Sequence, residues 1–237
     1  MFYFDEILGK KVLKSDKIKV PHFFTTREFI LKTKEENSEF QFENREIIKE
    51  LYNLKEIITP SQRHTSNVKI AQIGGNFIDT DGLILKNPDI GIFLNFADCT
   101  PLIFYDKKKN IAAISHAGWR GTVQKISKIT VSKMQSDPND LICLIGPSIC
   151  YNCFETNEDI KNQLISTVLH PENLYKKGDN DKWFVDLKGI NKMQLNEFGV
   201  KNIDIAPYCT VCNNNYFYSY RKENKTTNRM SAFICLK

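Results

Sequence analysis

The feature that most constrains the fold is a set of short segments in which apolar residues stand at consecutive positions. A strand with one face in water alternates apolar and polar residues, whereas a strand buried on both faces does not. We therefore expect sheets that are covered on both sides, as in a layered α and β sandwich. The segments are rich in residues that favour strands and cover 18–24, 68–72, 91–96, 102–105, 111–115, 141–145 and 232–236.

Helical periodicity occurs between these segments. Residues 44–54 carry apolar side chains at positions 47, 48, 51 and 54, which fall on one face of a helix. Thr156 followed by Asp159 resembles a capping box, and Asp186 can cap a further helix. The sequence therefore predicts a mixed α and β chain with helices over 44–54, 121–134, 156–169 and 186–199.

Length and composition favour one soluble domain. The 237 residues, 41% of them hydrophobic, can form one large core, so we expect a single domain over 1–237. No apolar run approaches the roughly 20 residues that span a bilayer, and Asp5 and Glu6 interrupt the apolar part of the N-terminus, which argues against a signal peptide. The expected location is the cytoplasm, with no membrane partner. The 33 Lys and Arg against 28 Asp and Glu form no long basic tract, so no nucleic-acid partner is expected.

The seven cysteines are expected to be reduced, because their number is odd and no export signal precedes them. Cys143 and Cys235 lie in apolar runs, where a cysteine packs as a small hydrophobe. The pairs Cys150-x-x-Cys153 and Cys209-x-x-Cys212 resemble a split zinc site. More than twice the usual interval of about 15 to 20 residues separates the pairs, however, which argues against a shared zinc.

Three metal-capable side chains lie beside the ends of predicted strands. They are His64 in SQRHTSNV, Cys99 in NFADCTP and His116 in ISHAGWRG. Pro101 is expected to break the strand after Cys99, so that the sulfur projects from a turn. Two imidazoles and one thiolate suit zinc, and three protein ligands leave a fourth position for water or substrate. The pattern predicts a catalytic zinc site in which the pKa of water falls toward about 7.

Other interpretations of these residues stay open. A lone histidine is usually a hydrogen-bonded core or surface residue, and the separations of 35 residues (64 to 99) and 17 residues (99 to 116) form no local motif. Cys99 could instead act as a nucleophile with His116 as its base, which requires the same proximity and no metal.

Five longer segments carry a family resemblance. ADCTPLIFYD, SHAGWRGTVQKI, IGPSICYNCFE, WFVDL and CTVCNNNYFYSYRKENKTTNRM occur in this order. With them the chain resembles the laccase-domain family, also called multicopper polyphenol oxidoreductase, purine nucleoside phosphorylase or peptidoglycan editing factor. The similarity begins near His22, and HAGWRG is its most specific part. The resemblance implies an α+β fold, a single-domain four-layer α/β/β/α sandwich with mixed sheets.

The resemblance also implies a site and an activity. Zinc would be held by His64, Cys99 and His116, with copper as the alternative metal and phosphate as co-substrate. Adenosine, inosine, guanosine and methylthioadenosine would be cleaved to base and ribose 1-phosphate, and adenosine would be deaminated by attack of activated water at C6. The partners expected are therefore a purine nucleoside and phosphate.

Arginines are the expected phosphate ligands, because the guanidinium group is a forked cationic donor. Arg27 in FFTTRE, Arg120 in HAGWRG and Arg221 in SYRK match arginines of the family pattern. Each could equally form a surface salt bridge of little energetic value. Asp98 could orient a metal ligand or simply cap a strand end.

The chain departs from the family pattern at Thr65 and Asn228, where glycine is usual, and at Ser148, where some members have cysteine. Thr65 is expected to narrow the approach to the metal. A multicopper oxidase needs more than the four histidines present, of which His22 is expected near the site and His170 at the surface. The alternatives to a nucleoside enzyme are a Cys-His hydrolase that edits a peptidoglycan precursor, a copper-dependent polyphenol oxidase and a zinc-binding module without activity.

Overall fold

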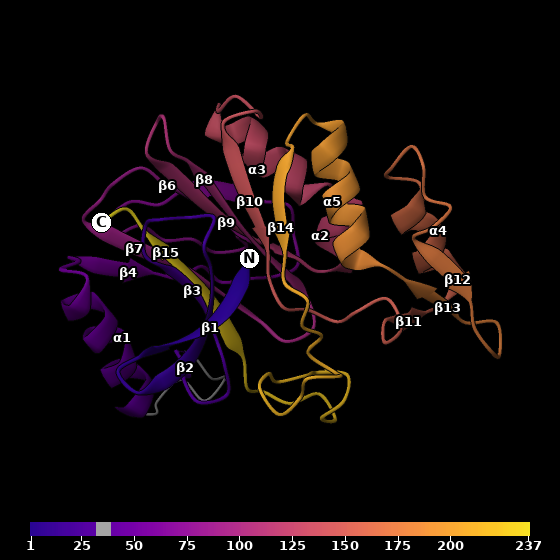
Figure 1. Ribbon diagram of the computed structural model, residues 1–237, viewed down its shortest axis with the longest axis horizontal. Helices are drawn as coiled ribbons and strands as arrows, with labels where there is room; N and C mark the ends of the chain where they lie inside the picture. The colour runs from indigo at the N-terminus through magenta and orange to yellow at the C-terminus, as the bar shows by residue number, and fades with distance from the viewer. Residues whose placement is uncertain (32–38) are drawn as a thin grey trace.

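Two six-stranded sheets form the centre of the computed structural model, which describes residues 1–31 and 39–237 (Figure 1). The first sheet has the order β1 (Phe2–Ile7), β2 (Lys10–Ser15), β3 (His22–Thr25), β15 (Met230–Cys235), β7 (Ile90–Phe96) and β4 (Glu56–Ile58). The second has the order β14 (Asn202–Ile205), β10 (Leu141–Ile145), β8 (Thr100–Asp106), β9 (Ile111–Ala117), β6 (Gly82–Leu85) and β5 (Val68–Ile70). Both sheets are mixed, because β4 runs parallel to β7, β5 to β6 and β10 to β14.

The two sheets pack face to face, and helices cover their outer faces. Phe24 and Leu94 of the first sheet share one buried cluster with Ile103 and Ile114 of the second. Helix α1 (Glu39–Leu51) packs Ile48 on the outer face of the first sheet. Helices α3 (Ile126–Met134) and α5 (Leu187–Glu197) cover the outer face of the second sheet. The predicted four-layer α/β/β/α sandwich is therefore confirmed, and the consecutive apolar positions reflect strands buried on both faces.

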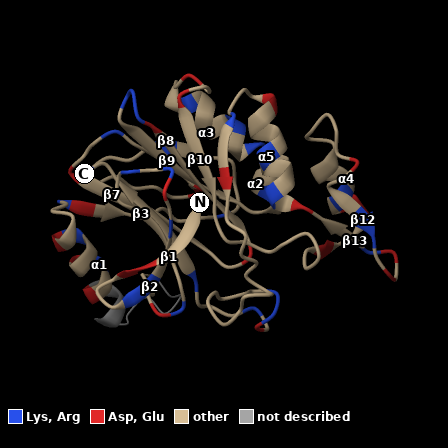
Figure 2. Ribbon diagram, in the orientation of Figure 1, with Lys and Arg blue, Asp and Glu red and all other residues tan. Residues whose placement is uncertain are grey.

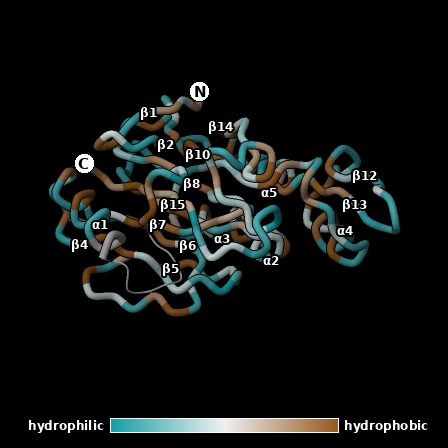
Figure 3. Tube along the Cα trace, turned by 90° about the horizontal axis from the view of Figure 1, so that it is seen from below, coloured by the Kyte–Doolittle hydropathy of each residue, from teal (hydrophilic) through white to brown (hydrophobic). Residues whose placement is uncertain are grey.

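A smaller unit lies to one side of the sandwich in both Figure 1 and Figure 3. It consists of α4 (Glu158–Ile165) and a three-stranded sheet of β11 (Glu155–Thr156), β13 (Trp183–Val185) and β12 (Tyr175–Lys177). The unit is part of the connection from β10 to β14, and its own buried cluster includes Leu164 and Val185. The crossover therefore adds a satellite core beside the main one.

All seven predicted strands are present, as β3, β5, β7, β8, β9, β10 and β15, with shifted ends. The prediction of one continuous helix over 121–134 is wrong. It is divided into α2 (Trp119–Val123) and α3, because Lys125 adopts a left-handed conformation with φ 58°. The helix predicted over 44–54 is present as α1 but ends earlier, at Leu51. Of the four apolar residues predicted to share one face, Ile48 and Leu54 are buried, whereas Ile47 and Leu51 are exposed.

Helix caps are partly as predicted. Asp186 caps α5 and accepts a hydrogen bond from the Gly189 amide at 3.0 Å. The capping box at Thr156 is wrong, because Thr156 belongs to β11 and Asn157 precedes the first turn of α4.

Acidic and basic residues are interspersed along the ribbon (Figure 2). Hydrophobic stretches concentrate in the strands of the sandwich (Figure 3). Within residues 1–31 and 39–237, every helix is too short or too polar to cross a lipid bilayer.

Candidate metal centre and adjoining pocket

Three segments bring His64, Cys99 and His116 together. His64 lies in the loop between β4 and β5, Cys99 in the turn between β7 and β8, and His116 at the second-last position of β9. The ligand nitrogens and sulfur all lie within 4.8 Å of one another, and His64 Nε2 is 3.8 Å from Cys99 Sγ. In a tetrahedral zinc site the corresponding nitrogen to sulfur distance is about 3.5 Å. The donors present therefore fit a zinc ion with small side-chain movements.

Strand pairing explains the proximity of Cys99 and His116. Strands β8 and β9 are antiparallel, and Pro101 stands directly opposite His116. The prediction that Pro101 breaks the strand is wrong, because it is the second residue of β8. A proline is tolerated there because it lies at the start of the strand. Cys99 still projects from a turn, since β7 ends at Phe96 and Asp98 adopts a φ of 82°.

Gly118 provides the space in which the ligands meet. A Cβ atom at this position would lie 2.9 Å from Cys99 Sγ and 3.1 Å from His64 Cδ2. Real Cβ atoms essentially never approach another atom to 2.9 Å, and a contact of 3.1 Å is unusually tight, so a larger residue would displace the Cys99 side chain and press on His64. The small residues after His116 thus allow close approach, as the sequence indicated.

Asp81 organises two of the three ligands, and sequence reasoning did not find it. Its fully buried carboxylate accepts a 2.9 Å hydrogen bond from His116 Nδ1 and bonds from the amides of Arg63, His64 and Thr65. The Nδ1 bond leaves His116 Nε2 to face the other ligands. The three amide bonds hold His64 at its left-handed φ of 60°. The sequence signal that could have indicated Asp81 is its position directly before the apolar run GLIL, which forms β6.

Gln62 fixes the His64 loop from the other side. Its side-chain amide donates to the Asn95 carbonyl and accepts from the Asn95 amide, both at 2.8 Å. Asn95 belongs to β7, so the loop is tied to both sheets. His64 is exposed but its backbone is held at two points.

The electrostatics of the site favour a thiolate. Burial raises the pKa of Cys99, but the charge and hydrogen bonds of His116 and His64 outweigh it and lower the pKa to about 6. Burial lowers the pKa of His116, but Cys99 and Asp81 outweigh it and raise the pKa to about 10. Burial raises the pKa of Asp81, but the bonds to His116 and to backbone amides outweigh it and lower the pKa to about 2. These shifts favour a charged thiolate at Cys99 and a charged imidazolium at His116 beside the Asp81 carboxylate.

A cavity of about 640 Å³ opens beside these three residues. This is within the range of small-molecule sites. Its lining combines rings that can stack on a planar base with cationic groups that can bind an anion. The aromatic residues are Phe96, Trp119, Phe154 and Tyr220, and the arginines are Arg120, Arg221 and Arg229.

Two of the three predicted arginines line the cavity. The Arg120 guanidinium lies 4.3 Å from the centre of the Trp119 ring, and Arg221 donates to the carbonyl oxygen of Glu155. Arg27 is not among the lining residues. It pairs with Glu223, donates to the Asn214 carbonyl and stacks on Tyr218, so its contacts are structural.

Arg229 is a lining residue that sequence reasoning did not select. Burial lowers its pKa, while the charge of Cys99 acts in the opposite direction, which indicates how near the two groups lie. Its guanidinium donates to the carbonyls of Thr226 and Asn228 at 2.6 and 2.7 Å. The SYRK segment and the following TTNRM segment therefore contribute one arginine each.

The hydrogen bonds of the Asp98 carboxylate go to residues other than His64, Cys99 and His116. The carboxylate accepts from Thr210 Oγ1 at 2.6 Å and from the Arg221 amide at 2.7 Å, so it joins the turn of Cys99 to the C-terminal loops. Thr65 donates its hydroxyl to Asp81 at 2.9 Å, which places the hydroxyl toward the carboxylate.

The two remaining histidines and Ser148 lie outside the ligand cluster. His22 is buried, accepts from the Ser15 amide and donates to the Val20 carbonyl, and burial lowers its pKa. His170 is exposed, as expected. Ser148 accepts a hydrogen bond from Thr100 at 3.3 Å.

The comparison with known proteins gives a family and a fold. Residues 24–237 match the family model described as multi-copper polyphenol oxidoreductase laccase. The purine nucleoside phosphorylase YlmD of Bacillus subtilis is 30% identical over 212 residues, 82% of this chain and 76% of that protein. The purine nucleoside phosphorylase SAR1163 of Staphylococcus aureus is 34% identical over 196 residues, 77% and 74% of the two chains.

Solved structures agree on the architecture. The hypothetical protein YfiH of Bacillus licheniformis superposes with a TM-score of 0.87 at 24% identity over 95% of this chain and 96% of its own. YlmD from Geobacillus stearothermophilus also gives 0.87, at 23% identity over 98% of both chains. At these identities the likeness concerns the fold.

Proposed function

Because this chain belongs to the multi-copper polyphenol oxidoreductase laccase family, we propose that it is a zinc-dependent purine nucleoside phosphorylase that also deaminates adenosine. The observation that carries the proposal is the convergence of two imidazoles and one thiolate at the edge of a cavity lined by aromatic rings and arginines. Relatives of 30% and 34% identity bear the name purine nucleoside phosphorylase, and the cavity has the chemistry that such substrates require.

Each part of the cavity has a role in the proposed reactions. Trp119, Phe154 and Tyr220 would stack on the purine, and Arg120, Arg221 and Arg229 would bind phosphate and offset its charge. A zinc ion held by His64, Cys99 and His116 would supply Lewis-acid assistance and a more acidic water. Inosine and phosphate would give hypoxanthine and ribose 1-phosphate as a phosphate oxygen bonds to C1′ and the bond to the base breaks. Adenosine and water would give inosine and ammonia.

Zinc is favoured over copper by the composition of the site. A copper site of two histidines and one cysteine usually has a methionine as a weak axial ligand. No methionine is among the residues that line the cavity beside the three donors. This supports a catalytic zinc site with an exchangeable position.

A second candidate is a cysteine hydrolase, such as one that edits a peptidoglycan precursor. The lowered pKa of Cys99 favours it, because a thiolate at neutral pH is a nucleophile. The two functions differ in their metal requirement, since the hydrolase would work in the presence of chelators.

The test combines turnover with metal analysis. Purified protein is expected to release hypoxanthine from inosine only when phosphate is present, and to lose activity with a chelator. His116→Ala is expected to lose one zinc per chain and to lower kcat/KM more than about 100-fold, beyond the effect of residues that merely support a ligand. The matched control is His170→Ala, the same substitution at an exposed histidine.

Two outcomes would contradict the proposed zinc enzyme. Turnover that survives chelation and disappears in Cys99→Ser would exclude the zinc enzyme and favour the hydrolase. A protein with no turnover of any nucleoside would leave a zinc-binding module as the alternative.

A further inference from the structure

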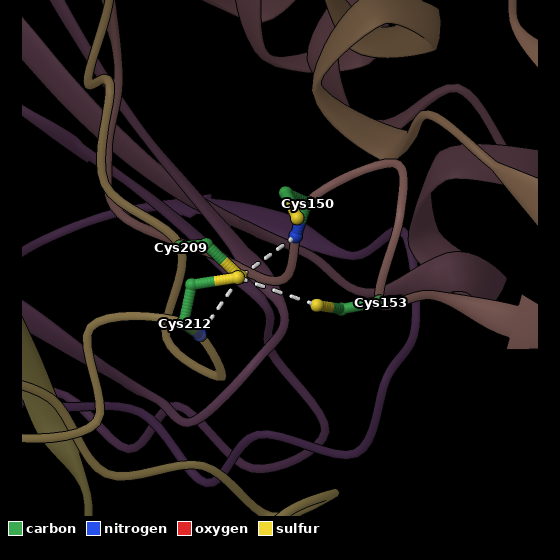
Figure 4. A group of neighbouring side chains, drawn as sticks. All are labelled: Cys150, Cys153, Cys209 and Cys212. Carbon is green, nitrogen blue, oxygen red and sulfur yellow. Dashed lines mark hydrogen bonds between the residues drawn. The ribbon is translucent and has the colours of Figure 1, made fainter.

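A second cluster of metal-capable side chains lies outside the ligand trio. Cys150, Cys153, Cys209 and Cys212 converge so that their sulfur atoms all lie within 4.8 Å of one another (Figure 4). Cys153 Sγ and Cys212 Sγ are 3.5 Å apart. None of these side chains belongs to the cavity lining described above.

The topology explains how two distant pairs meet. The first pair follows β10 and the second follows β14, and these strands are parallel neighbours. Parallel strands end at the same edge of a sheet, so the loops that follow them emerge side by side. A further parallel bridge between Ser148 and Cys209 and a hydrogen bond from the Thr210 amide to the Ser148 carbonyl continue this pairing. The long sequence interval between the two pairs predicts that they lie apart. That prediction is wrong, because the crossover between β10 and β14 brings the chain back beside its starting point.

We propose that these four cysteines bind one structural zinc ion. In a tetrahedral zinc site with four sulfur ligands at about 2.3 Å, neighbouring sulfurs are about 3.8 Å apart. Cys153 Sγ and Cys212 Sγ are 3.5 Å apart and no sulfur pair exceeds 4.8 Å, so the four sulfurs can reach an ion with small side-chain movements. Four thiolates fill the coordination sphere and leave no position for substrate, which makes the site structural.

Backbone donors support the thiolate form of the cluster. The amides of Cys150 and Cys212 point at Cys209 Sγ, with nitrogen to sulfur distances of 3.3 and 3.5 Å. Such bonds stabilise a charged sulfur. Lys188 supplies a nearby cation, since its buried ammonium donates to the carbonyls of Ala206 and Tyr208 and interacts with the charges of Cys209 and Cys150. A zinc with four thiolates has two negative charges, which this lysine would partly offset.

The proposed ion would also support one wall of the cavity. Thr210, between the two cysteines of the second pair, donates to Asp98, and Asp98 accepts from the Arg221 amide. The Arg221 guanidinium donates to the carbonyls of Cys153 and Glu155. Fixing the two loops would therefore fix Arg221, whatever the cavity binds.

The experiment counts metal in a protein that lacks the first site. His64→Ala/His116→Ala is purified under reducing conditions, incubated with zinc, freed of excess metal and analysed. We expect it to retain about one zinc per chain, and X-ray absorption at the zinc edge to show only sulfur neighbours at about 2.3 Å. Adding Cys212→Ala, a truncation at an exposed residue, is expected to remove that zinc. Cys143→Ala, at a cysteine outside both clusters, is the control and should keep it.

A second measurement uses the unaltered protein. Thiol titration in the native state should find the four cysteines protected until a chelator is added. Absence of zinc from the folded double variant, nitrogen neighbours in its absorption spectrum, or two disulfides in the reduced preparation would each overturn the proposal. Because no arm measures turnover, a failed nucleoside assay leaves the result intact.

Discussion

At the scale of single residues, Asp81 holds two of the three proposed metal ligands, His64 and His116, in position. It accepts bonds from two backbone amides beside His64, from the His64 amide itself, and from the Thr65 hydroxyl and the His116 ring. All of these partners are donors, so the side chain acts only as an acceptor. An asparagine side chain at this position would turn its NH2 group toward some of these donors, where no hydrogen bond can form.

Asp81→Asn is therefore expected to weaken zinc binding at the three-ligand site by about 10 to 100-fold. Competition with a chromophoric chelator measures the affinity, best in a Cys212→Ala background that removes the other cluster. Asp79→Asn is the matched control, because among the described residues this exposed carboxylate makes only a long ion pair, with Arg63. Equal affinities of the two variants would contradict the role given to Asp81.

The same residue makes stability depend on pH in a defined window. The pKa of Asp81 is lowered from 3.8 to about 2 in the folded protein. Its contribution, about 2 kcal/mol, is present above pH 3.8 and is lost as the pH falls toward 2. Denaturant unfolding of the metal-free proteins should thus show Asp81→Asn less stable at pH 7, with the difference shrinking below pH 4.

At the scale of elements, the junction of β9 and α2 leaves no room for a side chain at Gly118 beside Cys99 and His64. Gly118 has φ −65° and ψ 172°, which any residue can adopt, so its requirement comes only from contacts. Gly118→Ala is expected to lower zinc affinity at the three-ligand site more than about 10-fold, with little backbone strain, because the added carbon meets Cys99 and His64.

Gly9→Ala gives the opposite pattern and serves as the control. Gly9 has φ 71° in the turn between β1 and β2, and an added Cβ would contact nothing within 4 Å. The substitution should cost about 1 kcal/mol of stability through backbone strain and leave zinc affinity unchanged. Zinc titration and denaturant unfolding of both variants separate the two effects.

The elements also show what the sequence could predict. Strands buried on both faces, such as β7 and β8, were identifiable because apolar residues stand at consecutive positions along most of their length. The β1 and β2 hairpin was not, because its partly exposed strands mix charged and apolar residues. The three proposed ligands could be selected from residue chemistry and family resemblance, whereas Asp81 depends on a long-range contact across 35 residues to His116.

At the scale of the whole molecule, helix α5 joins the main core to the satellite core. Leu187 and Ile190 pack with the satellite unit of α4 and β13, and Leu195 packs on the second sheet. One rigid helix thus shares its faces between both cores. We therefore expect residues 1–237 to unfold as one domain.

The two tryptophans, Trp119 and Trp183, both pack at or within the satellite unit, so their fluorescence reports on that unit, while far-UV circular dichroism reports on the whole chain. Denaturant curves from the two probes should coincide. Leu164→Ala, in the satellite core, should shift both curves together by about 2 to 5 kcal/mol, whereas Leu169→Ala, at a 75% exposed position, should shift neither. A fluorescence transition at lower denaturant than the dichroism transition would show instead that the satellite unit unfolds independently, and that the cavity wall it carries can open without the sandwich.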